Sequence, residues 1–159
     1  MFVTWVLILA LASLTILIHL EGLWLQRLLP RHLADYPRVG VLAVVMTCLL
    51  LHVVEISLYA GGFMVGDKLF GVGQFTDEPH LDAMAYFYYS AITFTAVGYG
   101  DILPTGDIRL LAVAESLNGL LLIGWSGAYN FIAMQKLWSD RADELREVRK
   151  AERQKRRAT

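Results

Sequence analysis

The segment TFTAVGYGD stands out from the apolar sequence around it. Gly98 and Gly100 alternate with Val97 and Tyr99, and Asp101 closes the run. Because glycine has no Cβ, it adopts backbone conformations with positive φ that other residues rarely reach. The pattern therefore predicts an unusual main-chain conformation, in which backbone groups rather than side chains do the chemistry.

Part of this segment, TAVGYGD, resembles the selectivity filter of potassium channels. In those filters main-chain carbonyls replace the hydration shell of the ion. An ordinary strand alternates its carbonyls, so carbonyls that converge need residues with unusual dihedrals, here Gly98 and Gly100. The resemblance implies that K⁺ ions are bound by the carbonyl oxygens of Ala96, Val97, Gly98 and Tyr99, and Gly100 supports them.

Neighbouring residues fall where the family supports its filter. Thr93 and Thr95 can donate to nearby backbone carbonyls, and Thr95 is equally a candidate for a hydroxyl that faces a cavity. Asp101 matches the acid that the family places behind the filter mouth. The resemblance assigns Tyr88 or Tyr89 as the hydrogen-bond donor to this acid.

Ala96 departs from the family pattern, which usually has a second threonine at this place. That threonine lends its hydroxyl to the innermost ion site, and alanine keeps only the carbonyl. We therefore expect a weakened innermost site with potassium selectivity retained. A poorly selective monovalent cation channel is the alternative that Ala96 leaves open.

Two polar pairs lie inside apolar segments, each with a spacing of three residues that puts both members on one helix face. For His52 and Glu55 we favour a structural hydrogen bond, with proton-sensitive gating and a metal site as alternatives. For Glu115 we favour a hydrogen bond between packed helices. Asn118 fits such a bond and a polar cavity position equally well.

Three further residues of the last apolar segment are candidates for gating. Gly119 lies about one residue from the hinge glycine of the family, and we favour close helix packing for it. Trp125 and Tyr129 belong to a stretch that is suited to a hydrophobic constriction.

Composition indicates a membrane protein. Of 159 residues, 56% are hydrophobic and 18% are charged, whereas a soluble domain has about 25% charged residues. The net charge of −1 gives no case for a nucleic-acid partner. No nucleophile, acid–base pair or metal cluster indicates an enzyme, and we expect no cofactor apart from permeant K⁺.

Three apolar segments are long enough to span a bilayer, which takes about 20 residues. They cover residues 2–20, 39–60 and 110–134. The small residues at 10–13 also resemble a signal-peptide cleavage site, but the lack of a basic start favours a retained helix. The run at 83–95 is too short to span and predicts a re-entrant helix, preceded by a helix start at 77–79 with Asp82 in the first turn.

The distribution of charge predicts one orientation. The link at 27–38 contains three arginines, the region 61–107 contains six acids and one lysine, and nine basic residues follow Met134. Basic loops stay on the cytoplasmic side. We therefore expect an N terminus outside, a cytoplasmic C terminus and a location in the cell membrane, which the resemblance narrows to a bacterial inner membrane.

The sequence thus predicts an all-α membrane protein with three transmembrane helices, a re-entrant pore helix and a filter. The resemblance implies a homotetramer in the lipid bilayer that conducts K⁺ passively, without a soluble regulatory domain. A non-conducting membrane subunit that modulates a partner is the second alternative. We expect an N-terminal helix (1–29), a cytoplasmic link (30–38), a pore domain (39–138) and a basic tail that prolongs the last helix (139–159). Within the pore domain we expect an outer helix (39–60), a glycine-rich loop and pore helix (61–95), a filter (96–101) and an inner helix (107–138).

Overall fold

The computed structural model describes residues 1–26, 36–76 and 81–158, and its architecture is all-α. Three helices contain segments that are long and apolar enough to cross a membrane, and the only extended pairing in the described residues is a bridge between Phe75 and Pro104. The predicted fold class, an all-α membrane protein with three candidate spans, is confirmed. The helices are α1 (Phe2–Leu25), α2 (Pro37–Lys68), α3 (Ala83–Phe94) and α4 (Ile108–Ala158).

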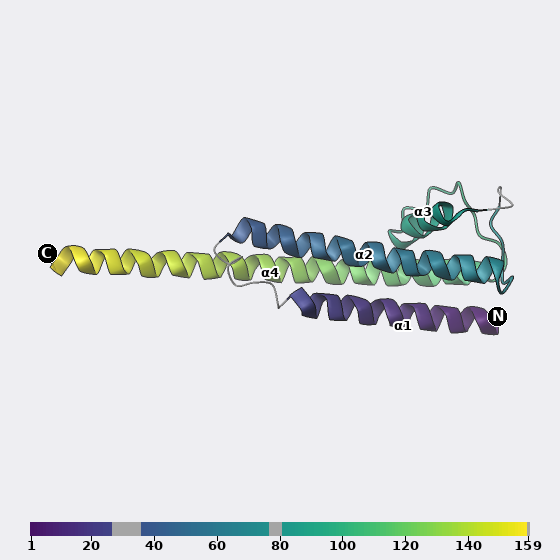
Figure 1. Cartoon of the computed structure of the whole chain (residues 1–159), viewed down its shortest axis with the longest axis horizontal. Coiled ribbons are helices and arrows are strands. Elements are labelled where there is room, and N and C mark those ends of the chain that lie inside the picture. Colours follow the sequence, from purple (N-terminus) through teal and green to yellow (C-terminus); the bar gives the residue numbers. More distant parts are fainter. Residues whose placement is uncertain (27–35, 77–80, 159) are drawn as a thin grey trace.

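The long helices lie side by side, and the short α3 leans against the C-terminal end of α2 (Figure 1). In a bilayer, a helix is favoured because it satisfies its own backbone hydrogen bonds. The N terminus lies at the same end of the bundle as α3 (Figure 1). There the Met1 ammonium group pairs with the carboxylate of Asp107, directly before α4.

Helix α2 is longer than the sequence predicted. It continues to Lys68, whereas we expected the outer helix to end at residue 60 and irregular structure to begin at Gly61. Gly62 serves helix packing, because a Cβ there would lie 2.4 Å from Leu11 Cδ1 of α1, and small residues let helices approach closely. Irregular backbone begins only after Lys68 and includes Gly71, which has positive φ.

Helix α4 runs without a break to Ala158, so the predicted boundary between an inner helix and a tail at residue 139 is not a structural boundary. The third span is prolonged as a helix, as expected, but it continues to Ala158 instead of fraying within the basic tail. At 1.5 Å per residue, the 51 residues of α4 extend about 75 Å, more than twice a hydrocarbon core of about 30 Å. The candidate span is Ile108–Ser139, and the rest projects beyond the other helices (Figure 1).

Two predicted connections fall partly or wholly on residues outside the described ranges. These are the link at 30–38, of which only the end is described, and the helix start at 77–79. The helix predicted within 1–29 is described as far as Gln26, which caps α1.

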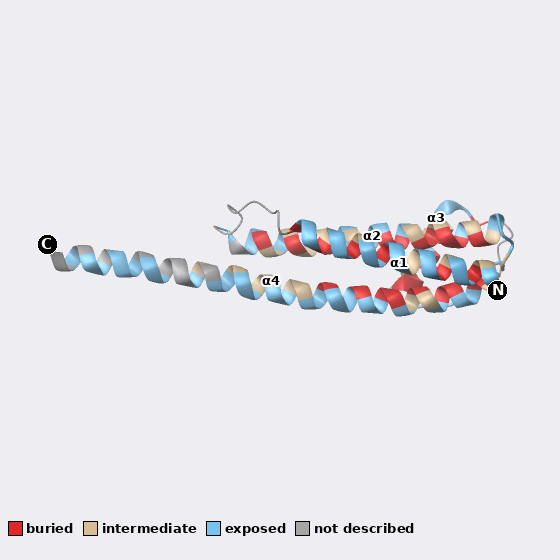
Figure 2. Ribbon diagram, turned by 90° about the horizontal axis from the view of Figure 1, so that it is seen from below, coloured by how far each residue is buried: buried red, intermediate tan, exposed pale blue. Residues whose placement is uncertain are grey.

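Buried side chains concentrate where α1, α2 and α4 face one another and under α3 (Figure 2). An aromatic group fills the space below α3: Phe63 of α2 meets Tyr89 and Phe75 edge-on, with ring centroids 5.0 and 6.0 Å apart. Such edge-to-face contacts are favourable beyond the burial of area alone. This packing fixes α3, and with it the segment that follows α3.

Candidate functional site

Helix α3 leads directly into the glycine segment, as we call residues 96–100. Asp82 caps the start of α3, because its Oδ1 accepts a hydrogen bond of 2.7 Å from the backbone N–H of Ala85. The prediction that placed Asp82 within the first turn is therefore corrected to the N-cap position. The first N–H groups of a helix have no partner within it, which explains why an acceptor side chain lies there.

The backbone of the glycine segment alternates in conformation. The φ angles are +56° at Ala96, +54° at Gly98 and +81° at Gly100, whereas Val97 and Tyr99 do not have positive φ. An extended chain directs its side chains and carbonyls to opposite sides in turn. Alternating signs of φ remove this reversal, so that successive carbonyls can point to one side. The two glycines thus have the dihedrals that the sequence argument required, and Ala96 takes on a conformation that costs a non-glycine residue about 1–2 kcal/mol.

One side of the glycine segment is uncovered in the single chain. The side chains of Val97 and Tyr99 are 54% and 73% exposed. On the other side, Ala96 and Gly98 line a groove together with Ser116 of α4. Strained backbone dihedrals are kept only where surrounding contacts stabilise them. On one side of the glycine segment the single chain does not supply such contacts.

Asp101, which follows the glycine segment, is bound by α3. The hydroxyl of Tyr88 donates to Asp101 Oδ2 at 2.7 Å. This hydrogen bond raises the pKa of Tyr88 above its ordinary value, so the hydroxyl keeps its proton throughout the neutral range. Of the two tyrosines that the resemblance offered, Tyr88 contacts the acid, whereas Tyr89 is buried against Phe63.

The two threonines at the end of α3 have different surroundings. Thr95 is exposed and its hydroxyl donates to the Ala91 carbonyl at 2.8 Å, which is the local backbone bond that the sequence analysis considered. Thr93 is buried, and its carbonyl accepts a hydrogen bond of 3.0 Å from Ser116 of α4. Both contacts attach the start of the glycine segment to helical structure.

Glu115 lies behind α3, fully buried. Its Oε1 is hydrogen-bonded to the hydroxyl of Ser90, which also bonds to the Ile56 carbonyl at 2.8 Å. A serine hydroxyl carries one proton, and the Ile56 carbonyl can only accept. Both bonds are satisfied together when Ser90 donates to Ile56 and the Glu115 carboxyl donates to Ser90. The favoured interpretation, a hydrogen bond between packed helices, agrees with this contact.

Gly119 is where α4 touches the end of α3. A Cβ at this position would lie 2.1 Å from the Phe94 carbonyl oxygen, which is far inside van der Waals contact. Close packing, the interpretation that we favoured for Gly119, therefore agrees with its surroundings.

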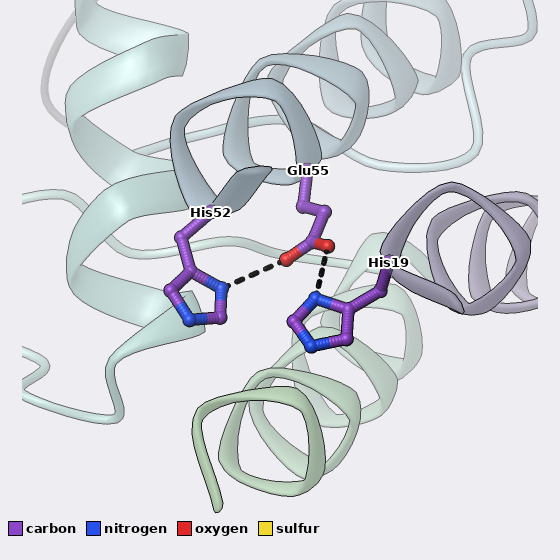
Figure 3. A group of neighbouring side chains, drawn as sticks. All are labelled: His19, His52 and Glu55. Carbon is purple, nitrogen blue, oxygen red and sulfur yellow. Dashed lines mark hydrogen bonds and ion pairs between the residues drawn. The ribbon is translucent and has the colours of Figure 1, made fainter. Parts of the chain in front are cut away.

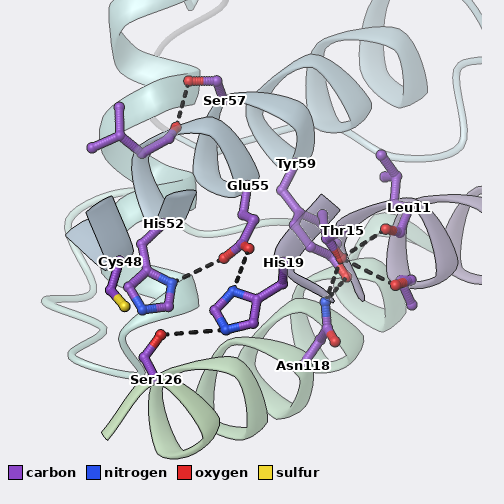
Figure 4. Close-up of polar contacts among 12 residues, drawn as sticks. Leu11, Thr15, His19, Cys48, His52, Glu55, Ser57, Tyr59, Asn118 and Ser126 are labelled. Carbon is purple, nitrogen blue, oxygen red and sulfur yellow. Dashed lines mark hydrogen bonds and ion pairs between the residues drawn. The ribbon is translucent and has the colours of Figure 1, made fainter. Parts of the chain in front are cut away.

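Asn118 joins all three long helices. Its amide donates to Thr15 Oγ1 of α1 at 2.7 Å and to the Tyr59 hydroxyl of α2 at 3.1 Å (Figure 4). The side chain is 5% exposed. This position favours the packing interpretation of Asn118 over that of a polar residue in a cavity.

Trp125 and Tyr129 lie one turn apart on α4 and line a groove with Leu20 and Trp24 of α1. The Trp125 side chain is 40% exposed. Both candidate gating residues thus lie at the contact between α1 and α4.

Several residues of the polar interior were not predicted from the sequence, among them Thr15, Ser90, Ser126 and the ionisable His19. His52 and Glu55 are hydrogen-bonded to each other, as we favoured, but Glu55 also binds His19 of α1 (Figure 3). A metal site was one of the alternatives for His52 and Glu55, and together with His19 these residues form a group of possible metal ligands. The signal was present, because a histidine in an apolar span is an ionisable residue that requires a partner.

Comparison with known proteins identifies the class. An ion-channel family model matches residues 46–136, more than half of the chain. The matched region contains most of α2, all of α3, the glycine segment and the apolar part of α4. The chain therefore belongs to this ion-channel family. No curated protein and no solved structure matches the chain.

Proposed function

We propose that this protein is a potassium-selective channel, through which K⁺ moves passively down its gradient. The observation that carries the proposal is the alternation of φ along the glycine segment, between α3 and α4 of an ion-channel chain. This backbone suits a row of carbonyl oxygens that replaces the water around a dehydrated cation. The ligands would be the carbonyls of Ala96, Val97, Gly98 and Tyr99.

A homotetramer follows from the same proposal. Potassium filters are rings of carbonyls from four loops, and one chain supplies one loop. The exposure of Val97 and Tyr99 supports this assembly, because neighbouring copies would cover them. The C-terminal end of α3 carries partial negative charge, which favours a cation in a cavity below the filter.

The proposed orientation places the N terminus and the glycine segment outside and the end of α4 in the cytoplasm. The pairing of Met1 with Asp107 supports a common side for the N terminus and the start of α4. The basic residues that follow Met134 belong to the opposite end, and basic segments stay in the cytoplasm. We place the protein in the cell membrane, that of a bacterium by family resemblance, with a transport function and no enzymatic one.

Flux through the purified protein in lipid vesicles tests the proposal. We expect a K⁺ gradient to drive flux and a Na⁺ gradient to drive far less. Equal fluxes would instead support the poorly selective cation channel, which Ala96 makes the second candidate. Absence of flux for both ions, from a protein that is folded and inserted, would overturn both and favour a non-conducting subunit.

Two alanine variants separate the effect of backbone conformation from the effect of an added Cβ. A Cβ at Gly98 or at Gly127 meets no atom within 4 Å in the chain, but only Gly98 has positive φ. Gly98→Ala should therefore lose the preference for K⁺ over Na⁺, since alanine disfavours this conformation by about 1–2 kcal/mol. Gly127→Ala, the control, should keep it. Retained preference in Gly98→Ala contradicts the assignment of the filter.

A further inference from the structure

Three ionisable side chains from two helices meet inside the bundle, apart from the proposed ion pathway. His19 Nδ1 lies 2.8 Å from Glu55 Oε1, and His52 Nδ1 lies 2.9 Å from Glu55 Oε2 (Figure 3). The side chains of His19 and Glu55 are fully buried, and that of His52 is 15% exposed. We call these three residues the His–Glu cluster.

The donor atoms of the cluster suit a divalent metal ion. Two imidazole nitrogens and one carboxylate oxygen are the protein ligands of open zinc sites of the His₂Glu kind. One such atom from each residue lies within 4.8 Å of the other two. Tetrahedral zinc with bonds of about 2.0–2.2 Å holds its ligand atoms roughly 3.3–3.6 Å apart. Small side-chain rotations would therefore close the cluster around an ion. We propose that His19, His52 and Glu55 bind one divalent ion of the zinc type per chain.

The surroundings of the His19 imidazole resemble those of a metal ligand, whose other ring nitrogen usually has a hydrogen-bond partner. His19 Nε2 lies 3.3 Å from Ser126 Oγ of α4. A serine hydroxyl both donates and accepts. Ser126 can thus donate to His19 when Nδ1 carries the ring proton, and accept from Nε2–H when Nδ1 binds a metal.

Aromatic contacts hold both rings in place. His19 packs against Trp125 with centroids 5.6 Å apart, and His52 packs against Phe94 at 5.7 Å. The two imidazoles also stack on each other at 5.4 Å. Since ligand rings that are fixed in advance lose little freedom on binding, these contacts favour a formed site over a fortuitous meeting of side chains.

Charge also favours a cation here. A buried carboxylate is stabilised when it is paired or binds a metal, and Glu55 is fully buried. The two hydrogen bonds supply part of this stabilisation, and a divalent ion would supply a full counter-charge. The ion would take the place of the protons on the two Nδ1 atoms.

Tetrahedral zinc needs a fourth ligand beside the three residues of the cluster. We assign this position to a water molecule or another small ligand. Cys48 lies one turn before His52 on α2 (Figure 4), but its thiol is engaged elsewhere. Cys48 Sγ lies 3.4 Å from Asn130 Oδ1 and 3.5 Å from Gln26 Nε2. A site with three protein ligands is the expected composition.

The proposal is tested by metal titration of the whole chain in detergent, after bound metal has been removed with a chelator. Zn²⁺ measured by calorimetry, and Co²⁺ by its visible absorption, should bind with one ion per chain. His19→Asn, His52→Asn and Glu55→Gln should each weaken binding at least tenfold. These amides keep the hydrogen bonds of the cluster but are poor zinc ligands, so they separate a metal site from a purely structural clamp.

Two variants serve as controls. Cys48→Ser removes the nearby thiol, and His80→Asn removes a histidine from outside the described residues. Both should bind Zn²⁺ like the unmodified protein. Loss of binding in either control, or unchanged binding in all three cluster variants, would assign the ion to another place and overturn the proposal. Absence of stoichiometric Zn²⁺ binding by the unmodified protein would overturn it as well.

A second measurement needs no variant. X-ray absorption at the zinc edge of the loaded, unmodified protein should report imidazole nitrogen and oxygen ligands without sulfur. A sulfur ligand, or a shell of oxygen alone, contradicts the assignment even if the variants fail to fold. Because this readout involves no ion flux, it stands or falls separately from the proposed potassium conduction.

Discussion

The hydrogen bond from Tyr88 to Asp101 connects the C-terminal end of the glycine segment to α3. The bond raises the pKa of Tyr88, so its stabilising effect is complete below the ordinary tyrosine pKa of about 10. It is lost only as the pH rises through the raised pKa of the folded protein. At neutral pH the hydroxyl is therefore a permanent donor to the carboxylate.

We predict that Tyr88→Phe lowers K⁺ flux, because the C-terminal end of the glycine segment, which is the proposed filter, loses this attachment. The same flux assay should give a pH dependence between 6 and 9 that does not differ between Tyr88→Phe and the unmodified protein, since Tyr88 does not titrate there. Tyr36→Phe is the control, because Tyr36 is exposed at the start of α2 and the structure gives no hydrogen bond from its hydroxyl to Asp101. If both variants conduct equally well, the contact has no role in the filter.

Substitutions of Glu115 test whether its carboxyl carries the proton that is shared with Ser90. In the arrangement described above, its carboxyl donates to Ser90, which donates to the Ile56 carbonyl. Glu115→Gln should keep the melting temperature nearly unchanged, because the amide also donates. Glu115→Ala should lower it, since it removes the donor and leaves a cavity, at a cost of about 1–3 kcal/mol. Equal melting temperatures for both variants would show that the proton is not where we place it.

At the scale of elements, the junction between α3 and α4 determines where the glycine segment begins. Gly119 lies against the main chain of Phe94, and backbone cannot move aside as a flexible side chain can. The position of α4 therefore constrains the position of the end of α3.

We predict that Gly119→Ala disrupts this junction and strongly reduces both thermal stability and ion flux. Its added Cβ would lie 2.1 Å from a carbonyl oxygen. Gly124→Ala is the matched control on the same helix, because a Cβ there meets no atom within 4 Å. Alanine favours helix over glycine by about 1 kcal/mol, so the control should be neutral or stabilising. Similar losses in both variants, measured by thermal unfolding and flux, would contradict the packing argument.

The elements were largely predictable from the sequence, since hydropathy alone marks helices in a membrane protein. The extension of α2 to Lys68 was not predictable, because a glycine that packs against another helix, as Gly62 does against Leu11, cannot be told from a loop glycine by composition. His19 was missed because the count of formal charges in the apolar segments treats histidine as neutral. The choice between Tyr88 and Tyr89 needed coordinates, since adjacent residues lie on different faces of a helix.

At the scale of the whole molecule, α1 is attached to the pair of helices that the family model matches. Asn118 binds Thr15, and Glu55 binds His19, so polar contacts reach α1 from both α2 and α4. Measured hydrogen bonds between membrane helices average about 0.6 kcal/mol, so these bonds orient α1 more than they hold it. The apolar contact between the helices must supply the rest.

The part of α4 beyond Ser139 differs from the region in which α1, α2 and α4 contact one another. It projects past the other helices (Figure 1), and its described side chains are nearly all exposed (Figure 2). The apolar span, the contact with Phe94 and the polar contacts to α1 all lie before Ser139. We therefore expect folding of the helix bundle to depend mainly on residues up to Ser139.

We predict that a chain ending at Ser139 assembles like the full-length protein and conducts K⁺ with the same preference over Na⁺. Mass measurement in mild detergent, together with vesicle flux, checks both parts. Deletion of residues 2–35, which removes α1 instead, is the comparison and should lower the melting temperature because His19 and Thr15 are lost. A chain that ends at Ser139 and remains monomeric would show that the part of α4 beyond Ser139 drives assembly, against the position of the packing contacts in the chain.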